Sequence, residues 1–212
     1  MKTKKLTIKK QKSIVLALFL ILLAAFLFSL CIGRYSISPI EAVQIILTSI
    51  VGDPESLDPV KYSVVISVRL PRIIIGILIG AGLASAGTAY QGIFGNPLVS
   101  QDILGVSSGA GFGAALGILI SAGVVMIEWL ALFFGLLAVG LVLLISRVQK
   151  RSELFMLVLS GVIVSAFFDA LVALIKYISD PQEKLPAIVF WLMGSLASST
   201  YRDVAIAAAV IL

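Results

Sequence analysis

Long apolar segments separated by short polar connections dominate the pattern along this chain. Residues 14–32 are 19 consecutive positions without a charge, and residues 73–89 form a second uncharged run of 17. A helix needs about 20 apolar residues to cross the hydrocarbon core of a bilayer. Further apolar segments predict crossings at 105–127, at 129–145, at 154–178 and from residue 201 onward. The pattern therefore predicts an all-α integral membrane protein, a polytopic helical bundle with about six crossings.

Two capping signals predict shorter helices between these crossings. Ser38, Pro39 and Glu41 have the order of an N-cap, a first-turn proline and a capping-box glutamate. The segment that follows alternates apolar and polar positions as far as residue 51, so we expect this helix at the membrane surface. A similar signal at 180–183 begins a short segment that ends near Gly194.

Composition supports the membrane class and excludes several kinds of chemistry. The 212-residue chain is 60% hydrophobic and 13% charged, whereas soluble domains average about 45–50% apolar and about 25% charged residues. It has no histidine and a single cysteine, Cys31, which lies in an apolar run. Haem ligation, zinc sites and histidine-dependent catalysis are therefore not expected. We read Cys31 as a small buried hydrophobe.

The distribution of charge predicts the orientation in the membrane. With the N-terminus inside, the inner segments 1–13, 90–104 and 146–153 hold nine basic residues against two acids. This agrees with the positive-inside rule. We predict that 1–13 is a basic cytoplasmic tail and that 14–212 is the transmembrane domain. A cleaved signal peptide is the alternative, but its apolar core is usually only about 7–15 residues long. The net charge of +5 then reflects topology, and no nucleic-acid partner is expected.

Glycines recur every four residues on two of the apolar segments. Such spacing strips one helix face down to backbone, and in lipid it lets a neighbouring helix approach closely. The segments predict two tightly packed membrane helices joined by a structured polar turn at residues 91–104. The glycines assigned to helix packing are Gly76, Gly80, Gly105, Gly109, Gly113 and Gly117.

Three charged residues within or beside the crossings are candidates for function. Asp169 lies well inside an apolar crossing, with Lys176 two turns away on the same face. Intramembrane acids usually face a cavity or a partner, so Asp169 either lines a water-filled pathway or pairs with a neighbouring helix. Arg69 and Arg72 lie on the predicted outer side of the membrane and are therefore exceptions to the positive-inside rule. They either snorkel to the interface or receive carboxylates of a partner.

An ordered set of motifs resembles the FecCD-type permeases, the membrane subunits of ABC importers for iron-siderophores, haem and cobalamin. The matching pieces are RLPR at 69–72, a small-residue helix ending in Gln91, NPL at 96–98, LGVSSGAG at 104–111, LVLSG at 157–161 and FWLMGSL at 190–196. The resemblance covers most of the chain from about Ser36 onward. NPL alone is a weak signal, but the ordered set at these separations is specific.

The resemblance implies a homodimeric permease of about ten helices per subunit in the inner, or cytoplasmic, membrane. It also implies two cytoplasmic ATPase subunits and an extracytoplasmic substrate-binding protein that docks on Arg69 and Arg72. The turn matches the inner end of the translocation path, with Leu98 a gate candidate. The residues assigned to the path and gate are Gln91, Asn96, Pro97, Leu98, Ser107, Ser108 and Asp169.

Two departures from the family pattern bear on this interpretation. Gln101 stands where family members often have proline, which alters the stiffness of the turn. The sequence also ends at Leu212, before the expected cytoplasmic coupling helix. We therefore expect an N-terminal portion of a permease domain, and transport by the isolated chain is doubtful.

The leading hypothesis is a permease that is not itself an enzyme and binds no cofactor. The sequence has no GxxxxGK[ST] motif, so ATP and Mg are expected on the partner ATPase. An ion-coupled secondary transporter is the first alternative, supported thinly by Asp169. An intramembrane enzyme and a truncated, non-transporting membrane protein are the others. The cargo itself is not readable from the sequence.

Overall fold

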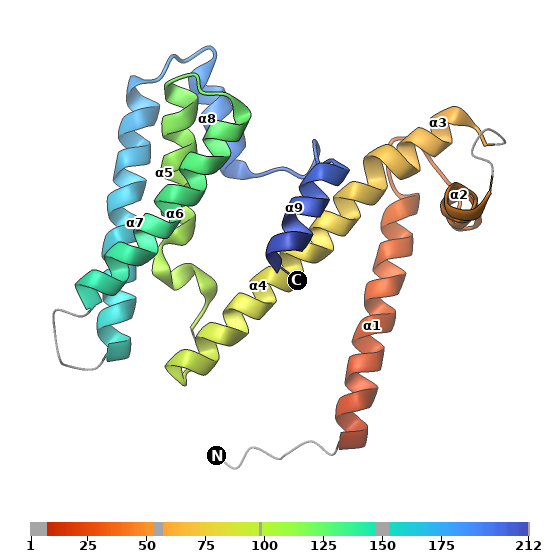
Figure 1. The fold of residues 1–212 in the computed structure, drawn as a ribbon, viewed down its shortest axis with the longest axis horizontal. Helices are drawn as coiled ribbons and strands as arrows, with labels where there is room; N and C mark the ends of the chain where they lie inside the picture. The colour runs from red at the N-terminus through yellow and green to blue at the C-terminus, as the bar shows by residue number, and fades with distance from the viewer. Residues whose placement is uncertain (1–7, 53–56, 98, 147–152, 212) are drawn as a thin grey trace. The chain divides into compact units, whose positions relative to one another are not determined.

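The computed structural model describes residues 8–52, 57–97, 99–146 and 153–211, and every regular element within these ranges is helical (Figure 1). The helices are α1 (Ile8–Cys31), α2 (Pro39–Val51), α3 (Pro59–Tyr62), the π-helix η2 (Ser63–Arg69), α4 (Leu70–Phe94), the 3₁₀-helix η3 (Gln101–Leu104), α5 (Val106–Leu119), α6 (Val124–Ser146), α7 (Glu153–Ile178), α8 (Lys184–Met193) and α9 (Tyr201–Ile211). This confirms the all-α class predicted from the sequence.

The chain folds as two compact units. The first comprises residues 1–81 together with 196–212, and the second comprises residues 82–195. Helix α4 begins in the first unit and ends in the second. Each unit has its own buried cluster of apolar side chains, and each is described separately below.

Four helices in the described ranges are long and apolar enough to cross a membrane: Lys10–Cys31, Pro59–Phe94, Val124–Ser146 and Phe155–Ile178. The expected count of about six is not reached there. The predicted crossing at 105–127 is divided, because α5 ends at Leu119 after 14 residues and α6 already begins at Val124. Ser121 adopts a positive φ of 55° in the intervening turn. Ser121 and Gly123 interrupt the apolar run too weakly for the pattern to reveal this break.

In the second unit, α5, α6 and α7 pack side by side (Figure 1). A side-chain carbon on Gly109 would lie only 2.5 Å from the Phe134 carbonyl oxygen of α6. Such contact between helix backbones is what small residues permit in membrane proteins. The row of glycines on α5 therefore packs closely against the following helix, α6. The glycines of α5 that lie against α6 are Gly109, Gly113 and Gly117.

Helix α8 is fastened to the same unit at the end of α5. The Lys184 ammonium donates a hydrogen bond to the Leu119 carbonyl oxygen, one of the last carbonyls of α5, where a cation is favourable to the helix dipole. Ile188 is fully buried in a cluster with Ala115 and Ile175. Together these contacts bring α8 beside α5 and α7.

In the first unit, α2 packs on the end of α1 and on η2. The Ser38–Glu41 capping box predicted from the sequence is present. The Lys61 ammonium forms an ion pair with the Glu41 carboxylate. The hydrogen bond that Lys61 donates within this pair and a second one from the Ser38 backbone amide hold the pKa of the Glu41 carboxyl below its ordinary value. The polar contacts fix the start of α2.

Candidate functional site

A groove of about 450 Å³ on the second unit gathers the polar residues of α5 and α7. Ser107 and Ser108 come from the first turn of α5, and Asp169 comes from the middle of α7. Three of the residues predicted to line a path therefore share one groove, together with Lys176. The complete lining is Ser107, Ser108, Gly111, Asp169, Val172, Ala173, Lys176 and Leu192.

The groove exists because α5 begins part-way along α7. Gly105, which precedes α5, lies against Ser165 of α7. Ser165 lies twelve residues after the first residue of α7, which is about 18 Å along the helix axis. The end of the segment that joins α4 to α5 therefore lies beside the middle of α7, one of the helices long and apolar enough to cross a membrane. Non-helical backbone is tolerated there only where it is buried in protein or lines a water-filled cavity.

Two glycines allow this segment to press against α7. A side-chain carbon on Gly161 would overlap the Ile103 carbonyl oxygen. Gly105 has a φ of 66°, a left-handed conformation that glycine adopts at no steric cost. Leu104, whose Cα lies 3.7 Å from a side-chain carbon built on Gly161, is 4% exposed. The sequence interpretation missed this role of Gly161, although the Ser160–Gly161 pair marks it as a small-residue position within a crossing.

The polar turn is held by its own hydrogen bonds. The Ser107 hydroxyl donates to the Asp102 carboxylate at 3.2 Å, and the Gln91 amide donates to the Val99 carbonyl oxygen at 3.5 Å. The Val99 amide in turn donates to the Asn96 carbonyl oxygen. Gln91 and Asn96 thus hold the turn through these hydrogen bonds, and neither they nor Pro97 line the groove. Leu98 lies outside the described residues, as does the basic loop at 147–152.

Asp169 and Lys176 introduce charge into the groove. They are seven residues apart on α7, which corresponds to about 10 Å along the axis. Within the described ranges the ion pair is Lys61–Glu41, and neither charge in the groove has such a partner. Ionisable side chains inside a membrane span that face a shared cavity mark functional sites by default. Asp169 thus lines a groove in the structure, and the water-filled pathway stays a prediction.

The two arginines of the RLPR motif have different environments in the first unit. Arg69 is 8% exposed, and its guanidinium donates to the carbonyl oxygens of Leu30, at 2.5 Å, and Tyr35. Arg72 is half-buried and donates to the Ala197 carbonyl oxygen. Arg69 therefore does not fit the expectation of an arginine available to an external partner. A carbonyl group in the last turn of α1 and one in the following loop already accept hydrogen bonds from its two terminal nitrogens.

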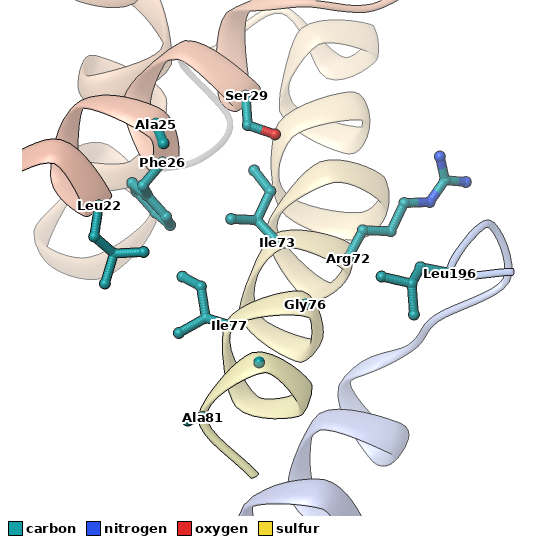
Figure 2. A pocket seen from close by; sticks show the side chains of 11 residues that line it. Leu22, Ala25, Phe26, Ser29, Arg72, Ile73, Gly76, Ile77, Ala81 and Leu196 are labelled. Carbon is teal, nitrogen blue, oxygen red and sulfur yellow. The ribbon is translucent and has the colours of Figure 1, made fainter. Parts of the chain in front are cut away.

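A second groove, of about 730 Å³, lies beside Arg72 (Figure 2). Apolar side chains of α1 and α4 line it, and the Arg72 guanidinium points away from the α1 side chains. Among the described residues, nothing lies within 4 Å of a side-chain carbon built on Gly80, and Leu196 lies 3.7 Å from one built on Gly76. The helix-packing role predicted for these two glycines therefore stays a prediction.

Comparison with known proteins decides the family. The sequence profile of the FecCD transport family matches residues 21–212. The chain belongs to the FecCD transport family. This confirms the resemblance carried by the RLPR, NPL and LGVSSGAG motifs.

FecCD relatives are permease proteins of import systems. The molybdate import system permease protein MolB of Haemophilus influenzae is 44% identical over 189 residues, which cover 89% of this chain and 56% of MolB. The hemin transport system permease protein HmuU of Yersinia pestis is 32% identical over 164 residues, 74% of this chain and 48% of HmuU. The cobalamin import system permease protein BtuC of Halobacterium salinarum is 38% identical over 146 residues, 68% of this chain and 39% of BtuC.

A solved structure has the same fold. It is described as an inward-facing conformation of a metal-chelate type ABC transporter, and it matches with a TM-score of 0.75 and 42% sequence identity. The match covers 92% of this chain and 57% of that one. The chain spans about half the length of the curated relatives it matches. The FecCD chain described here is thus a multi-pass membrane protein whose fold is that of ABC transporter permeases.

Proposed function

We propose that this chain acts in the membrane-spanning permease of an ATP-driven importer for a metal-bearing ligand. The observation that carries the proposal is membership of the FecCD transport family over residues 21–212. Relatives are named for molybdate, hemin and cobalamin. The proposed cargo is accordingly an iron-chelate, haem or cobalamin-type ligand, or an oxyanion such as molybdate.

The groove on the second unit is the proposed part of the translocation path. Its hydroxyl, carboxylate and ammonium groups come from Ser107, Ser108, Asp169 and Lys176. Polar side chains within a span offer a passing hydrophilic ligand replacements for its lost hydration. The half-length helix α5 supports the same interpretation, because it lets the polar turn and the first turn of α5 reach membrane depth.

The remaining machinery is proposed from the family and from charge. A second permease copy would complete the path, ATPase subunits carrying ATP and Mg would supply energy, and an extracytoplasmic binding protein would deliver cargo. The chain itself would bind no cofactor and catalyse no reaction. The six lysines in the first twelve residues support a cytoplasmic N-terminus in the inner membrane.

Transport measured in proteoliposomes tests this function. The native assembly that contains the chain is reconstituted, and uptake of labelled ferric chelate, haem, cobalamin and molybdate is followed with ATP and Mg on the cytoplasmic side. Uptake of one ligand that requires both ATP and the binding protein is expected. Uptake driven by a proton gradient without ATP would instead establish an ion-coupled transporter. Uptake under neither condition would leave a structural role.

Thiol labelling tests whether the groove contains water. In a Cys31→Ala background, Ser108→Cys is expected to react several-fold faster with a small polar thiol reagent than Ala114→Cys. Both positions lie on α5, but Ala114 is fully buried whereas Ser108 lines the groove. The measurement is the rate of modification in native membranes, read by mass. Equal, slow modification at both positions would show that the groove is dry.

Charge reversal tests docking at Arg72. Arg72→Glu is expected to abolish most stimulation of ATPase activity by the binding protein, whereas Arg72→Lys should retain it. The physical reason is that charges at the rim of an interface steer association with a partner of opposite charge. Stimulation is measured at a fixed amount of assembled complex and low salt. Full stimulation of Arg72→Glu would remove Arg72 from the docking surface.

A further inference from the structure

Helix α2 carries an apolar stripe that no other described part of its unit covers. Ala42 and Ile45 are buried at 1% and 4% exposure. Five larger apolar side chains are exposed to between 38% and 86%. The first four recur every three or four residues, and the fifth lies four residues after the third, so all five form one continuous stripe along the helix. These stripe residues are Ile40, Val43, Leu47, Ile50 and Val51.

The remaining side of α2 is polar. Glu41, Gln44 and Thr48 follow one another at helical spacing, so they form a third face distinct from the buried face and the stripe. Glu41 on this face pairs with Lys61. Helix α2 therefore has one face toward the protein, one polar face and one free apolar face. A helix on the surface of a soluble protein would have only the first two.

The fold places α2 where a bilayer ends. Its buried residues pack with Leu30, in the last turn of α1, and with Val65, in η2 at the start of the second long span. Residues at the two ends of membrane-crossing helices lie at the boundary of the hydrocarbon. The loop that joins α1 to α2 exposes Arg34 and Tyr35. Arginine and tyrosine are frequent at this boundary, where a polar tip meets an apolar stem.

We propose that the exposed stripe of α2 inserts into the interfacial layer of the lipid bilayer and anchors the outer end of α1. Continuity with a lipid-facing surface supports lipid as the occupant. Only 6% of the apolar window of α1 is buried within the part of the chain that the structure describes, and exposed apolar side chains of α1 continue as far as Phe28, in the last turn before α2 departs. An amphipathic helix with its apolar face at this level binds the boundary between headgroups and acyl chains.

The anchor would act independently of cargo and energy source. Because α2 also packs against η2, insertion of the stripe fixes the height and rotation of the two spans together. The ion pair between Glu41 and Lys61 then keeps the polar face toward water. This inference therefore stands or falls separately from the proposed transport function.

Spin labels on neighbouring positions of α2 test the proposal. In a Cys31→Ala background, Leu47→Cys and Ile50→Cys report on the stripe, and Gln44→Cys is the matched control on the polar face. The native assembly containing each variant is labelled with a nitroxide and reconstituted in lipid nanodiscs. Collision with dissolved oxygen, which concentrates in lipid, is compared with collision with a water-soluble nickel chelate.

The expected result is a ratio of oxygen to nickel accessibility several-fold higher at Leu47 and Ile50 than at Gln44. Equal ratios at all three positions would show that the stripe faces water, and would overturn the proposal. Immobile labels at Leu47 and Ile50 that meet neither reagent would also overturn it, because another protein surface would then cover the stripe. A change in stripe accessibility only after addition of the binding protein would identify that partner as the occupant.

Discussion

The Gly161→Ala variant is expected to unfold at a markedly lower temperature and to lose most transport activity. The added methyl group would overlap the Ile103 carbonyl oxygen. That oxygen belongs to backbone, so no side-chain rotation can relieve the overlap. Overpacking of a core costs about 1–3 kcal/mol and sometimes more, and we expect at least the upper part of that range. The turn would move away from α7 and carry Ser107 and Ser108 out of the groove.

Gly140→Ala is the matched control for this effect. Gly140 lies in α6, and among the described residues nothing lies within 4 Å of a side-chain carbon built there. Alanine is also the better helix former, by about 1 kcal/mol in water, so this variant should be neutral or slightly stabilised. Thermal unfolding in detergent and transport in proteoliposomes are measured for both variants. Unchanged unfolding and transport in Gly161→Ala would mean that Ile103 does not rest on α7.

The membrane class and most long helices could be predicted because hydrophobicity alone determines them. The apolar runs at 14–32, 73–89 and 154–178 each coincide with a span, since lipid forces an apolar segment to satisfy its backbone internally. The capping box at Ser38 was predictable for a similar reason, because it depends on four consecutive residues. Local patterns of this kind need no knowledge of tertiary contacts.

The short helix α5 could not be predicted, because its limits are set by tertiary contact. Residues 105–127 carry no charge and are mostly apolar, and the same composition would suit one long crossing. The start of α5 is fixed where Gly105 meets Ser165, and its end where Lys184 binds the Leu119 carbonyl oxygen. Periodicity along one segment carries no information about such distant partners. The residues of the groove were identified individually, but their meeting depended on this shortened helix.

Arg69 shows the same limit for a single side chain. In the sequence it is one of the two arginines that flank Leu70 and Pro71, and both suit an exposed docking surface. In the structure the π-helix η2 ends at Arg69, and the side chain enters the space beside Gly33. A side-chain carbon on Gly33 would lie 2.5 Å from Nη2 of Arg69, so the glycine makes room for the guanidinium. Residues 36 positions apart are matched, and no local pattern reveals this.

The Arg69→Met variant is therefore expected to lose about 3 kcal/mol of stability in the first unit, because a hydrogen bond to a charged group contributes about 1.5–3 kcal/mol. The Leu30 carbonyl belongs to the last turn of α1, where carbonyls lack helical partners and a cation is favourable. Loss of the guanidinium also removes the hydrogen bond to the Tyr35 carbonyl oxygen. That bond holds the loop that carries buried Ile37. Hydrogen exchange should become faster from residue 32 to residue 37.

Arg69→Lys and Arg34→Met make this expectation specific. Lysine keeps the charge but cannot reach two separate carbonyl oxygens with a rigid planar fork, so an intermediate loss is expected. Arg34 is exposed on the same loop, and its replacement should change stability by no more than about 0.5 kcal/mol. Equal stability of the Arg34 and Arg69 variants would contradict this structural role of Arg69.

If Arg69 instead served a binding protein, Arg69→Met would impair ATPase stimulation as Arg72→Glu does, while hydrogen exchange in the loop at residues 32–37 stayed unchanged. The opposite outcome is expected, since both carbonyl partners of Arg69 lie within its own chain.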